Sequence, residues 1–217
     1  IKIQNVKLDR NNEIVNLDGN LHVKNNKIFD LEINSKFSEN EKIYLKIKIE
    51  NNNKTITNFY SDRAEPFVKK YKFIKGFDGG HIDFQSIKKN NLTNSKLIID
   101  NFKVQEVPIL AKILTLASLQ GIADLLTGEG IRFTDFEMLY SKEDNLTKIE
   151  EIYCIGPAVS IMMDGYIEKD NLISLRGTLV PATTINRSIA SIPLLGDLLI
   201  GKKVGDGVFG VSFKIKG

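Results

Sequence analysis

The 217-residue chain is poor in the residues that support thiol, disulfide and metal chemistry. It has one cysteine, Cys154, two histidines, His22 and His81, and no tryptophan. A single cysteine cannot form an internal disulfide, and three Cys and His residues cannot supply the four ligands of a usual zinc cluster. The sequence therefore predicts no metal site, no cofactor and no thiol catalysis.

Long apolar runs and a strong net charge are also lacking. The longest apolar stretch, Val107 to Leu119, is interrupted by Lys112, and it is shorter than the roughly 20 residues of a membrane-spanning helix. The 30 basic and 27 acidic residues leave a net charge of +3, which is small for a nucleic-acid-binding protein. Because the chain opens at Ile1 without a signal-like segment, we expect any signal or anchor to lie outside it, in a longer protein.

Apolar and polar residues alternate through most of the first hundred positions. The clearest run is Ile43, Leu45, Ile47 and Ile49, with charged or polar residues between them. This period is typical of strands that bury one face. Asn- and Gly-rich punctuation, such as residues 51–53 and 79–80, predicts turns between antiparallel strands.

The same alternation recurs in the second half of the chain. It predicts long strands whose apolar residues share one face, with a hairpin at residues 169–171. The apolar residues of these strands include Val159, Ile161, Met163, Ile173, Leu175, Leu179, Phe209, Val211 and Phe213.

Helical spacing predicts three helices among these strands, over residues 62–74, 108–128 and 184–199. The first begins at Asp62, which forms a capping-box variant with Glu65. The second and third are apolar on more than one side, so we expect other parts of the protein or a partner to shield those sides from water. The predicted fold class is α+β: a mainly β chain whose long antiparallel, strongly curved sheet forms a groove or half-barrel with about three helices packed in or on it.

Catalytic constellations are not evident in the sequence. There is no G-x-S-x-G nucleophile motif. The acids of Glu150-Glu151 are adjacent on a strand and should point to opposite faces, so they are poor glycosidase candidates. The glycines of 127–130 and 201–207 lack the Lys-Ser/Thr of a phosphate-binding loop. We therefore predict no catalytic residues and a non-enzymatic role.

The long one-sided strands leave two interpretations open. A sheet curled into an apolar groove would hold acyl chains, which need removal from water and little directional bonding. Alternatively, the same faces pack against the helices as a closed core, which composition alone favours.

Several motifs in order resemble the C-terminal region of the AsmA-like proteins of Gram-negative bacteria, most closely the YhdP type, which is related to TamB-like bridges. They span residues 61 to 199: SDRA (61–64), GGHIDF (79–84), ILAKILTLASLQGI (109–122), TGEGIRF (127–133), GPA (156–158), LRGTLVPA (175–182) and IPLLGDLL (192–199).

The resemblance implies a periplasmic β-groove, anchored in the inner membrane, that carries phospholipid towards the outer membrane and so supports outer-membrane biogenesis in the cell envelope. It implies no catalytic residues. Its partners would be phospholipid acyl chains, the rest of the same long chain, a nearby membrane and envelope proteins, and not nucleic acid.

Under this interpretation the chain is one module, 1–217, made of residues 1–107, the apolar segment 108–128 and residues 131–217. The apolar strand residues named above would line the groove. The helical residues that would cap it, or contact a membrane or partner, are Ile109, Leu110, Ile113, Leu114, Ile192, Leu194, Leu195 and Leu198. The alternative function is a structural or protein-interaction module that caps such a bridge without binding lipid.

Overall fold

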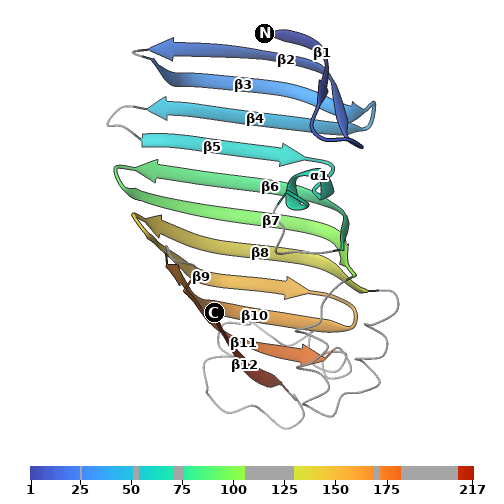
Figure 1. Cartoon of the computed structure of the whole chain (residues 1–217), viewed down its shortest axis with the longest axis vertical. Helices are drawn as coiled ribbons and strands as arrows, with labels where there is room; N and C mark the ends of the chain where they lie inside the picture. The colour runs from blue at the N-terminus through green and yellow to red at the C-terminus, as the bar shows by residue number, and fades with distance from the viewer. Residues whose placement is uncertain (25, 51–53, 71–75, 106–129, 169–171, 182–209) are drawn as a thin grey trace, which may run out of the picture.

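A computed structural model describes residues 1–24, 26–50, 54–70, 76–105, 130–168, 172–181 and 210–217 (Figure 1). They form one 12-stranded sheet and one short helix, α1 (Glu65–Val68). The strands are β1 (Lys2–Lys7), β2 (Glu13–Lys24), β3 (Lys27–Ser38), β4 (Glu41–Glu50), β5 (Lys54–Ser61), β6 (Phe77–Lys89), β7 (Leu92–Val104), β8 (Ile131–Glu143), β9 (Leu146–Ile155), β10 (Val159–Glu168), β11 (Ile173–Pro181) and β12 (Val211–Lys216).

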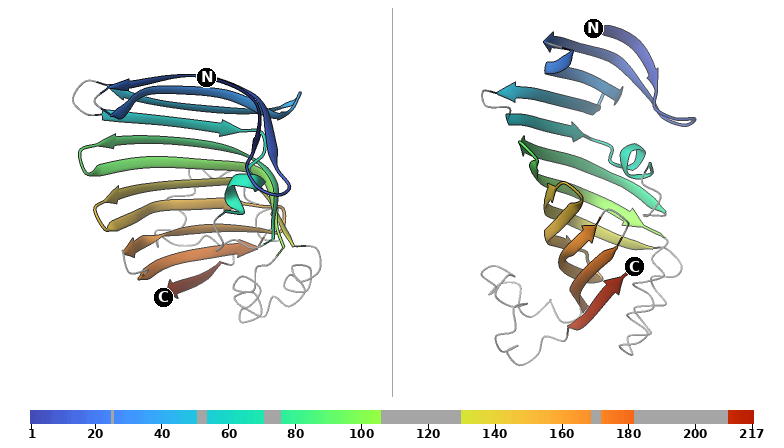
Figure 2. Two further views of the ribbon diagram at one scale, coloured as in Figure 1. Left: turned by 45° about the horizontal axis from the view of Figure 1, so that its top comes forward. Right: turned by 60° about the vertical axis from the view of Figure 1, so that its left-hand side comes forward.

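Each strand pairs antiparallel with the strands before and after it in the chain, so β1 and β12 are the two edges of the described sheet. The sheet twists but stays open (Figure 2). The prediction of a mainly β, antiparallel fold is confirmed, but the prediction of a strongly curved groove or half-barrel is wrong. Curvature is produced by β-bulges and glycine kinks; the described sheet has register shifts in the β2–β3, β3–β4, β8–β9 and β9–β10 pairs, whereas β4 to β8 pair without one. These central strands keep the ordinary twist of a sheet.

The α+β class with three helices is also not what the described residues form. Of the helix predicted over 62–74, only the four residues of α1 are helical among those described. The helices predicted over 108–128 and 184–199 lie outside the described residues. No helix in the described ranges is long and apolar enough to cross a membrane.

Asp62 does not cap α1, contrary to the predicted capping box. The N-cap is Ala64, and no side chain bonds to the helix start. The Asp62 carboxylate instead accepts hydrogen bonds from the Lys42 backbone N–H at 2.7 Å and from the Tyr60 hydroxyl at 2.5 Å. These partners belong to β4 and β5, so Asp62 secures the end of that hairpin, and Pro66 in the first turn helps to start the helix.

Asparagine and aspartate occupy the irregular points of the sheet. The described non-glycine residues with positive φ are Asn16, Asn26, Asn90, Asn101 and Asp144. Short polar side chains tolerate this left-handed conformation better than other residues do. Three of the five lie in the turns after β2, β6 and β8, which is why Asn-rich punctuation marks hairpins in this chain.

The hydrophobic core gathers where α1 covers one end of the strands. Phe77, Phe102 and Phe133, from β6, β7 and β8, stack with successive ring centroids 5.1 and 5.4 Å apart. Phe67 of α1 meets Phe59 of β5 edge-on at 4.8 Å. The core cluster consists of Ala64, Val68, Phe77, Ile82, Ile99, Phe102, Val104, Ile131, Phe133, Cys154, Val159, Ile161 and Leu179.

Candidate functional site

One face of the sheet, called here the apolar face, is hydrophobic across β4 to β12. Directly opposed residues of antiparallel strands point to the same face, so the register sorts side chains into rows across the sheet. The inner row, nearest α1, is Ile43, Ser61, Ile82, Ile99, Phe136, Cys154, Ile161, Leu179 and Val211. The middle row is Leu45, Phe59, Phe84, Leu97, Met138, Ile152, Met163, Gly177 and Phe213. The outer row is Ile47, Thr57, Ser86, Ser95, Tyr140, Ile149, Gly165, Leu175 and Ile215. The edge row is Ile49, Thr55, Lys88, Thr93, Lys142, Thr147, Ile167 and Ile173.

The inner row of the apolar face is mostly buried, and the middle row is mostly partly exposed. In the inner row, Ile82, Ile99 and Leu179 are 7%, 5% and 0% exposed. Phe84 and Leu97 in the middle row are only partly buried. Figure 1 shows α1 over the right-hand end of the strands. Ile47, Leu175 and Ile215 of the outer row are also partly exposed, so the outer part of the face keeps some accessible apolar surface.

The predicted groove residues divide by this difference in exposure. Val159, Ile161 and Leu179 are buried in the core cluster, whereas Leu175 in the outer row and Ile173 in the edge row are partly exposed. The structure thus places some of the predicted residues in a packed core and others on accessible surface.

Met163 and Phe213 come together over Gly177. A Cβ atom at Gly177 would lie 2.6 Å from Met163 Cγ and 2.7 Å from Phe213 Cζ, so both side chains cover the bare glycine. Val211, the predicted neighbour of Phe213 on β12, is partly buried in the inner row. The other predicted site residues lie outside the described residues: Phe209, Ile109, Leu110, Ile113, Leu114, Ile192, Leu194, Leu195 and Leu198.

A bulge on β9 keeps the apolar face continuous. Ile152 pairs with Met138, and Ile149 pairs with Tyr140. Ile149 and Ile152 are three residues apart on β9, whereas Met138 and Tyr140 are only two residues apart on β8. Glu150 is the extra residue, and both it and Glu151 point to the other side of the sheet, where Glu150 accepts a hydrogen bond from Ser141 at 3.4 Å. The prediction that these adjacent acids point to opposite faces is therefore wrong, because it assumed an unbroken strand.

The opposite side of the sheet, called here the charged face, carries cross-strand ion pairs. Lys46 pairs with Glu32 at 3.1 Å, Lys96 with Glu137 at 2.9 Å and Arg176 with Asp164 at 2.9 Å. Exposed pairs of this kind each contribute about 0–1 kcal/mol to stability. Their main consequence is that the two faces of the sheet differ sharply in polarity.

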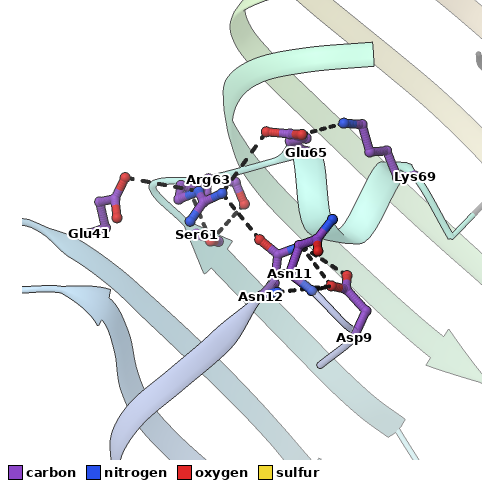
Figure 3. Close-up of polar contacts among 8 residues, drawn as sticks. All are labelled: Asp9, Asn11, Asn12, Glu41, Ser61, Arg63, Glu65 and Lys69. Carbon is purple, nitrogen blue, oxygen red and sulfur yellow. Dashed lines mark hydrogen bonds and ion pairs between the residues drawn. The ribbon is translucent and has the colours of Figure 1, made fainter. Parts of the chain in front are cut away.

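Arg63 joins the β1–β2 turn to β4 and α1 (Figure 3). Its Nη2 donates to Asn12 Oδ1 at 3.2 Å, its Nε lies 3.9 Å from Glu41, and its guanidinium carbon lies 4.8 Å from the centre of the Phe37 ring. Glu65 of α1 lies 4.0 Å from Arg63 and also pairs with Lys69. This arrangement attaches the first hairpin to the rest of the sheet.

The turn beside Arg63 is held by Asp9. Its Oδ1 accepts the backbone N–H groups of Asn11 and Asn12 at 2.8 and 2.9 Å, and the Asn12 side chain donates to both carboxylate oxygens. The hydrogen bonds from Asn12 and Asn11 lower the pKa of Asp9. Asp9 and Lys69 border an open hollow of about 420 Å³ whose other lining residues are Arg10, Asn11, Asn12, Arg63 and Glu65. Asp9, Asn12, Arg63, Glu65 and Lys69 are linked to one another by hydrogen bonds and ion pairs, so the hollow is best explained as part of the contact that attaches the first hairpin.

The Tyr60–Asp62 pair predicts a pH dependence of stability. The hydrogen bond between them is the largest cause that lowers the pKa of Asp62 and that raises the pKa of Tyr60 to about 12. The Asp62 contribution is complete above the ordinary carboxyl value near pH 4 and is lost as the pH falls through the lowered folded value. The Tyr60 contribution is complete below about pH 10 and is lost as the pH rises towards 12. We expect Tyr60→Phe to flatten both limbs in denaturant unfolding measured across pH, and a profile unchanged by the substitution would contradict this.

The described thiol and acidic residues offer little chemistry. Cys154 is buried in the core, and burial raises the pKa of its thiol, which keeps it protonated and a poor nucleophile. On the charged face, burial and the neighbouring Asp135 raise the pKa of Asp100. His22 and His81 are both exposed. Within the described ranges, no group of three or more His, Cys, Asp and Glu side chains could hold a metal ion.

Comparisons with protein-family models, with curated proteins and with solved structures find no match to this chain.

Proposed function

We propose that the apolar face binds phospholipid acyl chains and that the chain is a non-enzymatic part of a lipid conduit. The observation that carries the proposal is one face of an open sheet whose middle row is apolar on every strand from β4 to β12 except at Gly177 and is partly exposed on all of them except at Ile152 of β9, with partly exposed apolar residues such as Ile47, Leu175 and Ile215 beyond it in the outer row. Burial of each methylene contributes about 0.8 kcal/mol. Similar sites repeat from strand to strand, so a lipid can move along the face without a large barrier.

The binding surface in this proposal is an open track. Acyl chains lie on the middle and outer rows, against side chains such as Phe84, Leu97, Met163 and Leu175. The buried inner row supports this surface from the core. The ion pairs of the charged face stay in water on the other side of the sheet.

The proposed setting follows from the resemblance to AsmA-like proteins, carried by motifs between residues 61 and 199. In that setting the chain is a periplasmic portion of an inner-membrane-anchored protein in a Gram-negative bacterium. It passes phospholipid between the inner and outer membranes and supports outer-membrane biogenesis, with the rest of the same long chain and envelope proteins as partners.

Native mass spectrometry of the purified chain, with extraction of any lipid that co-purifies, tests the proposal. We expect about one or more phospholipids bound per chain, either on purification or after incubation with phospholipid vesicles. A mass without lipid under both conditions would contradict lipid binding and favour the alternative of a structural or protein-interaction module.

A further inference from the structure

Two lysines stand at the outer margin of the apolar face. Lys88 of β6 and Lys142 of β8 both pair with Thr93 of the intervening strand β7. The register therefore places both lysines in the edge row, on the same side of the sheet as the apolar rows. Both are exposed, and neither forms an ion pair with another described residue.

Polarity changes in the same order along three adjacent strands. The side chains on the apolar face, taken in order from the α1 end outward, are Ile82, Phe84, Ser86 and Lys88 on β6; Ile99, Leu97, Ser95 and Thr93 on β7; and Phe136, Met138, Tyr140 and Lys142 on β8. Each strand thus passes from apolar groups through a hydroxyl to a lysine or threonine.

A phospholipid lying along these strands has the same order of polarity. Two residues of a strand span about 7 Å, so the distance along β6 from Phe84 to Lys88 is about 14 Å, enough to hold part of an acyl chain, the glycerol esters and a phosphate. The serine hydroxyls already bond to each other, Ser95 to Ser86 at 3.0 Å, and hydroxyls retain further donor and acceptor capacity.

Charge complementarity indicates which headgroup fits. The edge row holds two lysines and no carboxylate from β4 to β11. The nearby acids Glu50, Glu143 and Glu168 are each one residue beyond an edge-row position and therefore point to the charged face. On the charged face, by contrast, Lys46 and Lys96 are each paired with a glutamate.

We infer that Lys88 and Lys142, with the hydroxyls of Ser86 and Tyr140, form a headgroup site for a phospholipid of net negative charge, while the buried Ser95 bonds to Ser86 beneath it. The acyl chain of that lipid lies over Phe84 and the middle row. The inference rests on the proposed function, because it takes the apolar face as the acyl-chain surface and adds an orientation and a selectivity to it. The headgroup then lies at the left-hand ends of β6 and β8 in Figure 1.

Competition between two lipids with identical acyl chains tests this site. Full-length chain is incubated with equal amounts of phosphatidylglycerol, which is anionic, and phosphatidylcholine, which is zwitterionic, and the bound species are counted by native mass spectrometry. We expect a preference of about fivefold for the anionic lipid, given two exposed charge contacts, which weakens as salt is added. The double variant Lys88→Gln/Lys142→Gln should lose the preference and still bind phosphatidylcholine.

A matched control removes the same charge from the other face. Lys48 and Lys148 are exposed and lie one row from the edge row, on the charged face, so Lys48→Gln/Lys148→Gln should keep the preference. Loss of the preference in this control too, or its retention in the edge-row variant, would overturn the headgroup site. If the unsubstituted chain binds neither lipid, the proposed function itself fails, whereas equal binding of both lipids contradicts only the headgroup site.

Discussion

The Leu179→Asp variant should unfold, whereas Leu175→Asp should stay folded and lose its bound lipid. The two leucines lie on β11 and point to the same face, but Leu179 is 0% exposed within the core cluster and Leu175 is partly exposed in the outer row. A buried carboxylate without a partner costs about 4 kcal/mol or more, which is a large share of the stability of a typical domain. At Leu175 the carboxylate can reach water, so the cost should be about 1–2 kcal/mol.

Circular dichroism and denaturant unfolding measure the fold of these variants, and native mass spectrometry measures the lipid they retain. Ser174→Asp, one residue from Leu175 and on the charged face, is the control that introduces the same charge without touching the apolar face. It should fold and keep its lipid. A stable Leu175→Asp variant with undiminished lipid would show that acyl chains do not lie on the outer row.

A methyl group at Gly165 should destabilise the sheet by about 3 kcal/mol or more. Gly165 has a φ of +148°, and a Cβ atom there would lie 2.1 Å from the carbonyl oxygen of Ser174 and 2.9 Å from Leu175 Cα. Both contacts are with the backbone of β11, which cannot move without breaking its pairing with β10. Strained φ values alone cost about 1–3 kcal/mol, and the clash adds to that cost.

Denaturant midpoints of Gly165→Ala and Gly217→Ala compare this site with an unobstructed one. A Cβ at Gly217 would meet nothing within 4 Å, so its substitution should change stability by no more than about 0.5 kcal/mol. Equal midpoints for the two variants would mean that β10 and β11 do not approach each other as described.

The strands were predictable because alternation reports directly on a one-sided sheet. The run from Ile43 to Ile49 predicts β4, and the two runs either side of residues 169–171 predict the antiparallel pair β10 and β11. Turn residues were a weaker signal: the turn predicted at residues 51–53 lies outside the described residues, and the turn predicted at Gly79 and Gly80 is wrong, because both glycines lie within β6, with φ values of 74° and 82°. Alternation is a local signal that does not depend on distant contacts.

The curvature of the sheet and the start of α1 were not predictable in the same way. Curvature depends on where the register slips, as at Glu150 on β9, and a slip is visible only once the partner strand is known. Asp62 matches a helix cap in sequence, yet its carboxylate bonds to Tyr60 and to the backbone of Lys42, which lies 20 residues away. The curvature of the sheet and the start of α1 therefore both depend on contacts with residues that are distant in the sequence.

The sequence predicts which face of the sheet carries the candidate site, but it does not predict how deeply each side chain on that face is buried. Periodicity places Leu175 and Leu179 on one side of β11 with equal weight, because it records direction and not what covers a side chain. Burial among the residues near α1 separates them. The lysines of the edge row, Lys88 and Lys142, also carry a sequence signal, since each is the polar end of an apolar alternation, but only the register shows that they flank the same threonine.

The central claim is that acyl chains lie on the apolar face, and single-tryptophan quenching tests it most directly. Because the chain has no tryptophan, Leu175→Trp and Tyr166→Trp each introduce one reporter, the first on the apolar face and the second on the charged face of the adjacent strand, where Tyr166 is 38% exposed. Phospholipid brominated in its acyl chains quenches only tryptophan that it touches. We expect strong quenching and a blue shift for Leu175→Trp and little change for Tyr166→Trp. Equal quenching at both positions, or none at position 175 while lipid is bound, would contradict the account.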